Sequence, residues 1–204
     1  LPIDGHVPLS MRARDVTPHV QSLEHLRNYE MDCVSDPEIW LAARQQQLVN
    51  TANEPGNVLR TRLHELQRLT AISNEDPEVC AGMTEALKAT TTVPTLRMNS
   101  MDLHIPFMRE DFNQAMRLIP ASVEQEWGAA RTALLASEEP VDTTFAEWSL
   151  RRTGELHAAG VPIAAGTDTP IGWSIPGYSL HTELEQYVEV GMTPLEALYS
   201  ATVA

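Results

Sequence analysis

Short apolar or β-branched runs alternate with longer helical segments along this chain. Four of the runs have the length and composition of strands, at residues 1–5, 20–24, 91–96 and 161–165. A helix-rich segment follows each of them. This alternation is typical of parallel βα units, in which a helix crosses back over the sheet. The pattern therefore predicts an α/β fold built from about four βα units.

Residues 37–90 are expected to form three helices inserted into this scaffold. Asp36-Pro37-Glu38 and Asp76-Pro77-Glu78 each place Asp at the N-cap, Pro at the first helical position and an acid in the first turn. Glu54-Pro55-Gly56 separates the first helix from the second. An amphipathic stripe at three- and four-residue spacing predicts that second helix, with Leu59, Leu63, Leu66 and Leu69 on one face.

Further helices are predicted on either side of this insertion. A short one is expected around residues 10–16, and an irregular helical stretch at 110–136 is broken at Pro120. Residues 143–159 form an amphipathic helix for which Gly160 is the C-cap glycine. Two helices follow, over about 180–190 and from Thr193-Pro194 onward.

Chemically active side chains stand where three of the predicted strands end. His6 and His25 follow the first two strands, and Asp168 follows the 161–165 run through Gly166-Thr167. The carboxyl ends of parallel strands are where α/β proteins, and barrels above all, place their chemistry. Imidazole and carboxylate groups are zinc ligands. The sequence therefore predicts a metal-dependent hydrolase site at these strand ends.

Charge and hydropathy exclude two classes of partner. The formal net charge is −14, with 28 acids against 14 basic residues, and no Lys or Arg follows Arg152. Nucleic-acid binding needs a basic surface, so it is not expected. The purely apolar runs are far shorter than the roughly 20 residues of a membrane helix. The single lysine, Lys88, lies in a predicted helix, which argues against a catalytic amine.

The sequence leaves the redox state and the compartment open. Cys33 and Cys80 lie 47 positions apart with no CxxC motif, so two buried thiols are favoured and a disulfide remains an alternative. The first residues lack the basic-then-apolar pattern of a signal peptide, and the chain begins at Leu1 rather than at Met. A soluble protein, cytoplasmic or secreted, is expected.

Several motifs carry a resemblance to a known family that spans nearly the whole chain. They are Asp4-Gly5-His6, Leu23-Glu24-His25, Val93-Pro94-Thr95-Leu96, Ala165-Gly166-Thr167-Asp168-Thr169-Pro170, Gly177-Tyr178-Ser179-Leu180-His181-Thr182-Glu183-Leu184 and Gly191-Met192-Thr193-Pro194. On these residues the chain resembles the amidohydrolase superfamily, specifically its imidazolonepropionase-like branch of metal-dependent hydrolases.

This resemblance implies that residues 1–204 are the C-terminal half of a TIM-like (β/α)8 barrel. They would supply strands five to eight, with the helical insertion at 37–90, and the barrel domain would be truncated at both ends. In the family the first strand supplies a His-x-His ligand pair, and no His-x-His occurs in this sequence.

The resemblance also assigns roles to five residues. His6, His25 and Asp168 would bind one or two divalent metals, zinc being expected. Asp168 would also act as general base and acid in the hydrolysis of C–N bonds by metal-activated water. The small-molecule substrate would be a cyclic amide or peptide-like, and His181 and Tyr178 would contact it.

Two other interpretations compete with this one. The chain could be a catalytically inactive half-barrel whose open strand edges and apolar helix faces associate with another chain, either a second copy or the missing N-terminal half. The same scaffold could also carry deaminase or phosphotriesterase-like chemistry, because a fold does not fix a reaction.

Overall fold

Three short parallel strands form one sheet in the computed structural model, which describes residues 3–49 and 54–204. They are β1 (Asp4–Gly5), β2 (Ser22–Glu24) and β3 (Thr91–Val93), in the order β1-β2-β3. The register pairs Asp4 with Ser22 and Leu23 with Thr92. A parallel bridge from Thr92 to Ile163 adds the fourth predicted run beside β3. Parts of all four predicted strand segments therefore lie side by side in chain order, and residues 1–2 of the first segment lie outside the described residues.

The chain divides into two units, which are described separately. The first comprises Leu1–Pro94 with Glu155–Ala164 and Ala204, and it holds the sheet. The second comprises Thr95–Gly154 and Ala165–Val203. Sequential parallel order is the neighbour order of barrel βα units. It is compatible with the predicted half-barrel, and barrel membership stays a prediction.

The predicted third strand ends sooner than its composition indicates. Thr95 has a left-handed backbone with φ 51°, and the short helix α5 (Leu96–Asn99) begins directly after it. The expectation of a strand through residue 96 was therefore wrong at its end. The β-branched composition of this run favours a strand. At Leu96 and Arg97, however, the backbone amides donate hydrogen bonds to Glu183, which lies far away in the sequence, and a helix begins instead.

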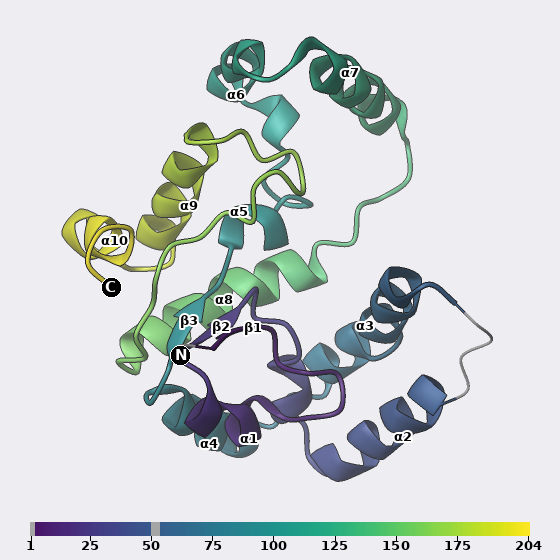
Figure 1. Ribbon diagram of the computed structural model, residues 1–204, viewed down its shortest axis with the longest axis vertical. Helices are drawn as coiled ribbons and strands as arrows, with labels where there is room; N and C mark the ends of the chain where they lie inside the picture. The colour runs from purple at the N-terminus through teal and green to yellow at the C-terminus, as the bar shows by residue number, and fades with distance from the viewer. Residues whose placement is uncertain (1–2, 50–53) are drawn as a thin grey trace. The chain divides into compact units, whose positions relative to one another are not determined.

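The helical insertion in the first unit is confirmed as three helices. They are α2 (Pro37–Val49), α3 (Gly56–Ser73) and α4 (Pro77–Leu87), and Figure 1 shows α2 and α3 side by side. Shorter helices accompany them, namely α1 (Ala13–Val16), η1 (Thr17–His19) and η2 (Glu30–Asp32). The predicted leucine stripe on α3 is only partly covered, because Leu63 is 1% exposed whereas Leu66 is 52% and Leu69 is 40% exposed.

Local capping explains where several helices begin and end. The Asp76 carboxylate accepts from the amides of Glu78 and Val79, which are 2.9 and 3.3 Å away. Asp36 instead has a left-handed backbone with φ 58°, and its carbonyl accepts from the amide of Ile39. At the end of α8 (Thr144–Ala158), Gly160 has φ 82° and donates to the His157 carbonyl, as a C-cap glycine does.

A disulfide joins Cys33 to Cys80 and corrects the expectation of two thiols. It links the segment after η2 to α4. The same two segments are also joined by a hydrogen bond of 2.7 Å from the Asp76 amide to the Cys33 carbonyl, and by a bridge between Val34 and Glu75. Spacing alone could not reveal this pair, because 47 residues separate the two cysteines.

The second unit is helical in its described residues and packs around a small aromatic core. Its remaining helices are η3 (Pro106–Met108), α6 (Glu110–Ala115), η4 (Met116–Leu118), α7 (Ala121–Ala136), α9 (Tyr178–Glu189) and α10 (Pro194–Ser200). Phe107, Phe112 and Trp127 form the centre of the core with Ile175. The predicted break at Pro120 and the helix start at Thr193, which carries a capping box with Glu196, are confirmed. No helix in the described ranges is long and apolar enough to cross a bilayer.

Candidate metal centre

Two of the predicted ligands come together at the carboxyl edge of the sheet. His6 directly follows β1 and His25 directly follows β2. Because the parallel register aligns Gly5 with Leu23, the next residues, His6 and Glu24, stand at the same level of the edge. The centroids of the two imidazole rings are 4.8 Å apart, with their planes at 73°. The two histidine side chains therefore lie close together, while their role as metal ligands stays a prediction.

Backbone conformation and hydrogen bonds hold the loops that carry these residues. The chain turns sharply after β2, where His25 has φ 66° and Asn28 has φ 68°. The His25 amide donates to the Val93 carbonyl at 2.7 Å, which ties the turn to β3. The buried Asn28 side chain donates to the Val7 carbonyl at 2.9 Å, which links the loop after β2 to the loop after β1.

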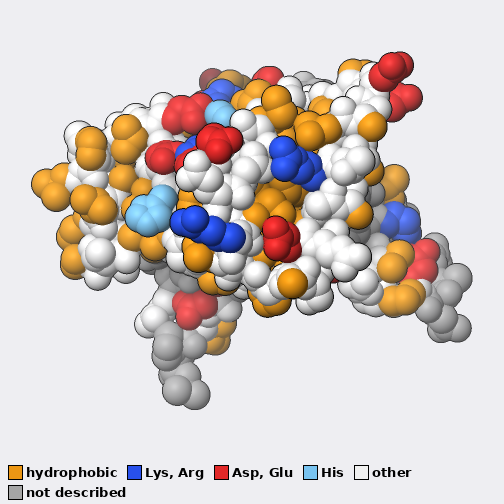
Figure 2. Space-filling model, turned by 90° about the horizontal axis from the view of Figure 1, so that it is seen from above, with side chains coloured by type: hydrophobic (Ala, Val, Ile, Leu, Met, Phe, Trp, Pro, Cys, Tyr) orange, Lys and Arg blue, Asp and Glu red, His pale blue; other side chains and the backbone are white. Residues whose placement is uncertain are grey.

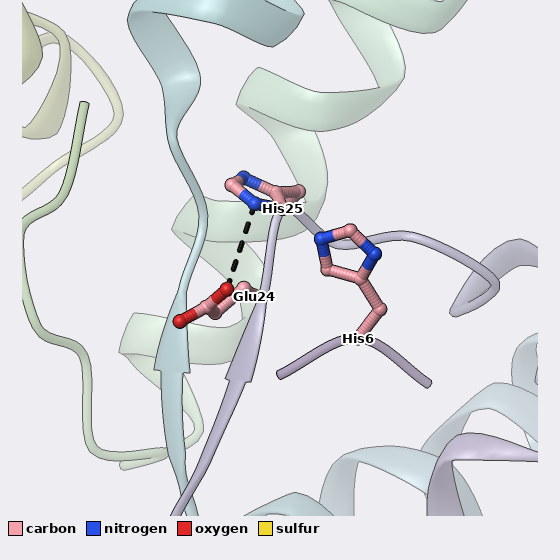
Figure 3. Close-up of side chains that lie close together, drawn as sticks. All are labelled: His6, Glu24 and His25. Carbon is pink, nitrogen blue, oxygen red and sulfur yellow. Dashed lines mark ion pairs between the residues drawn. The ribbon is translucent and has the colours of Figure 1, made fainter. Parts of the chain in front are cut away.

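Glu24 adds a carboxylate to this pair. Its Oε2 lies 3.6 Å from Nε2 of His25, and one donor atom from each of His6, Glu24 and His25 lies within 4.8 Å of the others. Figure 3 shows the three side chains at the ends of neighbouring segments. His25 is 6% exposed, whereas His6 and Glu24 are half-buried. Two imidazoles and a carboxylate that converge at a partly open edge are a donor set that fits a divalent metal ion.

Asp168 belongs to the second unit, so its approach to the two histidines stays a prediction. It has φ 52°, and its carbonyl accepts from the Ile171 amide at 2.9 Å. Hydroxyl contacts order the rest of this turn, with Thr169 Oγ1 lying 2.8 Å from Thr167 Oγ1 and 2.6 Å from Ser174 Oγ. The half-buried Asp168 therefore stands on a structured loop within its own unit.

A buried arginine next to this loop was not anticipated from the sequence. Arg97 donates to the carbonyl oxygens of Ile171 and Gly172, each at 3.0 Å. Burial lowers the pKa of Arg97 to about 10, while the negative charges of Glu183 and Asp168 act in the opposite direction. Arg97 thus supplies positive charge beneath the Asp168 loop. No spacing signal marks it, since it directly follows the run 91–96 that was expected to form a strand.

Glu183 is a buried carboxylate that the sequence did not single out. It is 0% exposed, and its two carboxylate oxygens accept from the amides of Leu96 and Arg97 at 2.8 and 2.7 Å. It therefore caps α5 from α9. The buried positions of α9 are Ser179, Glu183, Gln186 and Tyr187. They recur at helical spacing, but because three of them are polar, no apolar pattern in the sequence marks this face.

The two predicted substrate contacts both stand on α9. Tyr178 opens the helix, and its ring centroid lies 6.0 Å from that of Phe112. Burial, together with a hydrogen bond to Asp111, raises the pKa of its hydroxyl. His181 is exposed one turn further along. Contact of either residue with a substrate stays a prediction.

Comparison with known proteins supports the fold. No protein-family profile matches this sequence, and no curated protein matches it. A solved structure named bottromycin amidohydrolase superposes on the chain with a TM-score of 0.60 and 19% sequence identity, over 98% of this chain and 39% of that one. This chain therefore shares the fold of part of that protein and spans 39% of its length. The imidazolonepropionase-like branch stays a prediction.

Proposed function

We propose that this chain is part of a metal-dependent hydrolase that acts on C–N bonds of cyclic amide or peptide-like substrates. The observation that carries the proposal is the convergence of the His6 and His25 imidazoles at the carboxyl edge of parallel strands. The likeness to an amidohydrolase fold supports the same reading. Within that family resemblance, the imidazolonepropionase-like motifs favour small amide substrates.

The residues would divide the chemistry among them. His6 and His25 would hold a divalent metal, with zinc favoured because imidazole is one of its common ligands. When bound, such an ion polarises a carbonyl and promotes deprotonation of water at neutral pH. The Asp168 carboxylate would accept the proton from the attacking water and deliver it to the leaving nitrogen. Tyr178 and His181 would orient the substrate.

Turnover assays on the zinc-loaded chain test this proposal. We expect hydrolysis of at least one member of a panel of cyclic amides and dipeptides. Asp168→Asn should reduce kcat by about 10²–10⁴-fold, as loss of a general base does, and should leave the bound metal in place. His19→Ala is the matched control, because His19 is exposed on η1 and should have no effect. Metal-loaded protein that hydrolyses no member of the panel would contradict the proposal.

A second candidate is a non-catalytic half-barrel that pairs with another chain. Within the described residues β1 pairs with β2 alone, so it forms an edge of the sheet. Large apolar side chains are exposed on and after α10, namely Leu195, Leu198, Tyr199 and Val203. Figure 2 shows hydrophobic side chains gathered at its left edge, the side on which α10 lies in Figure 1. Exposed strand edges and apolar patches favour association.

Native mass measurement distinguishes the two candidates. The second predicts a dimer, or a complex with a separate N-terminal half, together with absent hydrolysis. A monomer that hydrolyses an amide substrate would exclude it. An oligomer that hydrolyses the substrate would indicate that the partner completes the site.

A further inference from the structure

We infer that Glu24 is a third ligand of the proposed metal centre, so that His6, Glu24 and His25 together hold a divalent cation within the first unit. The inference rests on the metal dependence proposed above and adds a residue that the resemblance does not supply. It is carried by the juxtaposition of the three side chains at the edge of the sheet.

The separation between Glu24 and His25 fits a shared ion better than a direct hydrogen bond. Two ligands held about 2.0–2.2 Å from one tetrahedral ion lie roughly 3.4 Å apart. Glu24 Oε2 and His25 Nε2 are 3.6 Å apart. An N–H···O hydrogen bond is typically about 2.7–3.2 Å long, so this pair is too far apart for one. His6 supplies the third donor, because one ligand atom from each of the three residues lies within 4.8 Å of the others.

The backbone explains how two consecutive residues present their side chains to one point. Successive side chains of an extended strand face opposite sides of the sheet. β2 ends at Glu24, and His25 takes a left-handed conformation with φ 66°. That turn redirects the His25 ring, as Figure 3 shows. The hydrogen bond from the His25 amide to Val93 fixes the turn.

Burial and charge favour a cation at this place. His25 is buried, while the Glu24 side chain is 36% exposed. The site is therefore covered by protein at His25 and accessible to solvent at Glu24. Two neutral imidazoles and one carboxylate offset half of a 2+ charge. The combination of two histidines and one glutamate occurs in catalytic zinc sites, which leave a fourth position for water or substrate.

All three donors belong to one unit and to neighbouring strand ends. Affinity for the ion should therefore depend on Glu24 as well as on His6 and His25. This expectation separates the inference from the ligand set that the resemblance implies, in which Asp168 is a ligand and Glu24 is not.

Zinc affinity of the full chain tests the assignment. The probe is zinc, titrated in competition with a chromophoric chelator, and cobalt substitution provides a visible spectrum as a second readout. Glu24→Gln keeps the size of the side chain and should weaken zinc binding by more than the roughly 10–100-fold typical of residues that only support a ligand. It should also change the cobalt spectrum. Glu85→Gln is the matched control, because Glu85 is exposed, pairs with Lys88 and is not one of the converging donors.

Each outcome decides between the two assignments. Loss of affinity in Glu24→Gln supports the inference. Unchanged affinity in Glu24→Gln, with loss in His6→Ala, overturns it and leaves the proposed hydrolase intact. Zinc bound through Glu24 in a chain that hydrolyses no amide supports the site and contradicts the proposed function. Circular dichroism of Glu24→Gln should match that of the unsubstituted chain, so that lost affinity is not lost folding.

Discussion

The carboxylate of Glu183 accepts a hydrogen bond of 2.8 Å from the backbone amide of Leu96, although 87 positions separate the two residues. With its second bond, to the Arg97 amide, Glu183 caps a helix that belongs to a different part of the chain. Figure 1 shows α9, which carries Glu183, beside α5. The capped helix begins where the predicted third strand was expected to continue, so this contact also places the end of that strand.

Stability should depend on pH through Glu183. Burial, the largest influence, raises the pKa of Glu183 from 4.5 to about 7. Between these values the folded state retains a proton that the unfolded state has released, so the free energy of unfolding falls as pH rises through this window. The loss relative to Glu183→Gln should reach at most about 3 kcal/mol. Urea unfolding at about pH 5 and about pH 8 measures it.

A neighbouring carboxylate controls for general effects of charge. Glu185 is exposed and pairs with Arg109, so Glu185→Gln should change stability by no more than about 1 kcal/mol at either pH. If the free energy of unfolding depends on pH in the same way in the unsubstituted chain and in Glu183→Gln, the Glu183 carboxylate does not titrate in this range.

Arg44 should be a large contributor to the first unit. It is 0% exposed and donates to Asn28 Oδ1 at 2.5 Å and to Gln67 Oε1 at 2.8 Å. Burial raises the pKa of the Glu30 carboxyl, and the positive charges of Arg68 and Arg44 oppose that rise. Arg44→Met would leave Glu30 with less compensation in the interior. We expect a loss of about 3–5 kcal/mol in the free energy of unfolding, measured by denaturant titration.

The contrast with a surface arginine makes this prediction specific. Arg62 pairs with Glu54 in a partly exposed ion pair, and Arg62→Met should cost no more than about 1 kcal/mol. Adding Glu30→Gln to Arg44→Met should restore part of the loss. Equal effects of the two arginine substitutions would count against a buried charge network.

The disulfide should stabilise the first unit. Cross-linking Cys33 to Cys80 closes a long loop, and such bonds contribute about 2–4 kcal/mol by restricting the unfolded chain. The Cys33→Ser, Cys80→Ser double variant should have a correspondingly lower free energy of unfolding. A reductant should lower the Tm of the unsubstituted chain and leave that of the variant unchanged. Detection of two reactive thiols in the non-reduced, unfolded protein would instead confirm the expectation of free cysteines.

Two helical glycines should respond oppositely to alanine. A Cβ at Gly154 would lie 2.6 Å from the Val190 carbonyl oxygen, so Gly154→Ala should destabilise the second unit by about 1–3 kcal/mol. A Cβ at Gly128, within α7, would meet nothing within 4 Å. Gly128→Ala should therefore stabilise the protein by about 0.5–1 kcal/mol. Thermal unfolding of both variants checks the sign of each effect.

Much of the local structure could be predicted because its causes lie within a few residues. Asp76 caps α4 through amides two and three positions ahead of it. Gly160 ends α8 because glycine adopts a positive φ without a steric penalty. Proximity of His6 and His25 could also be predicted, since parallel pairing brings the carboxyl ends of neighbouring strands to one edge.

By itself, the sequence determined several helix boundaries, the approximate positions of the strands and the two histidines at strand ends, because capping, turn formation and periodicity act over short distances along the chain. Only the tertiary structure decided that Cys33 pairs with Cys80, that Glu183 is buried against α5 and that Glu24 turns towards His25. The first two join residues 47 and 87 positions apart. The third depends on a left-handed turn that no periodic pattern records. The physical reason is the same for all three, since packing and hydrogen bonding between distant segments outweigh the weak preferences of single residues.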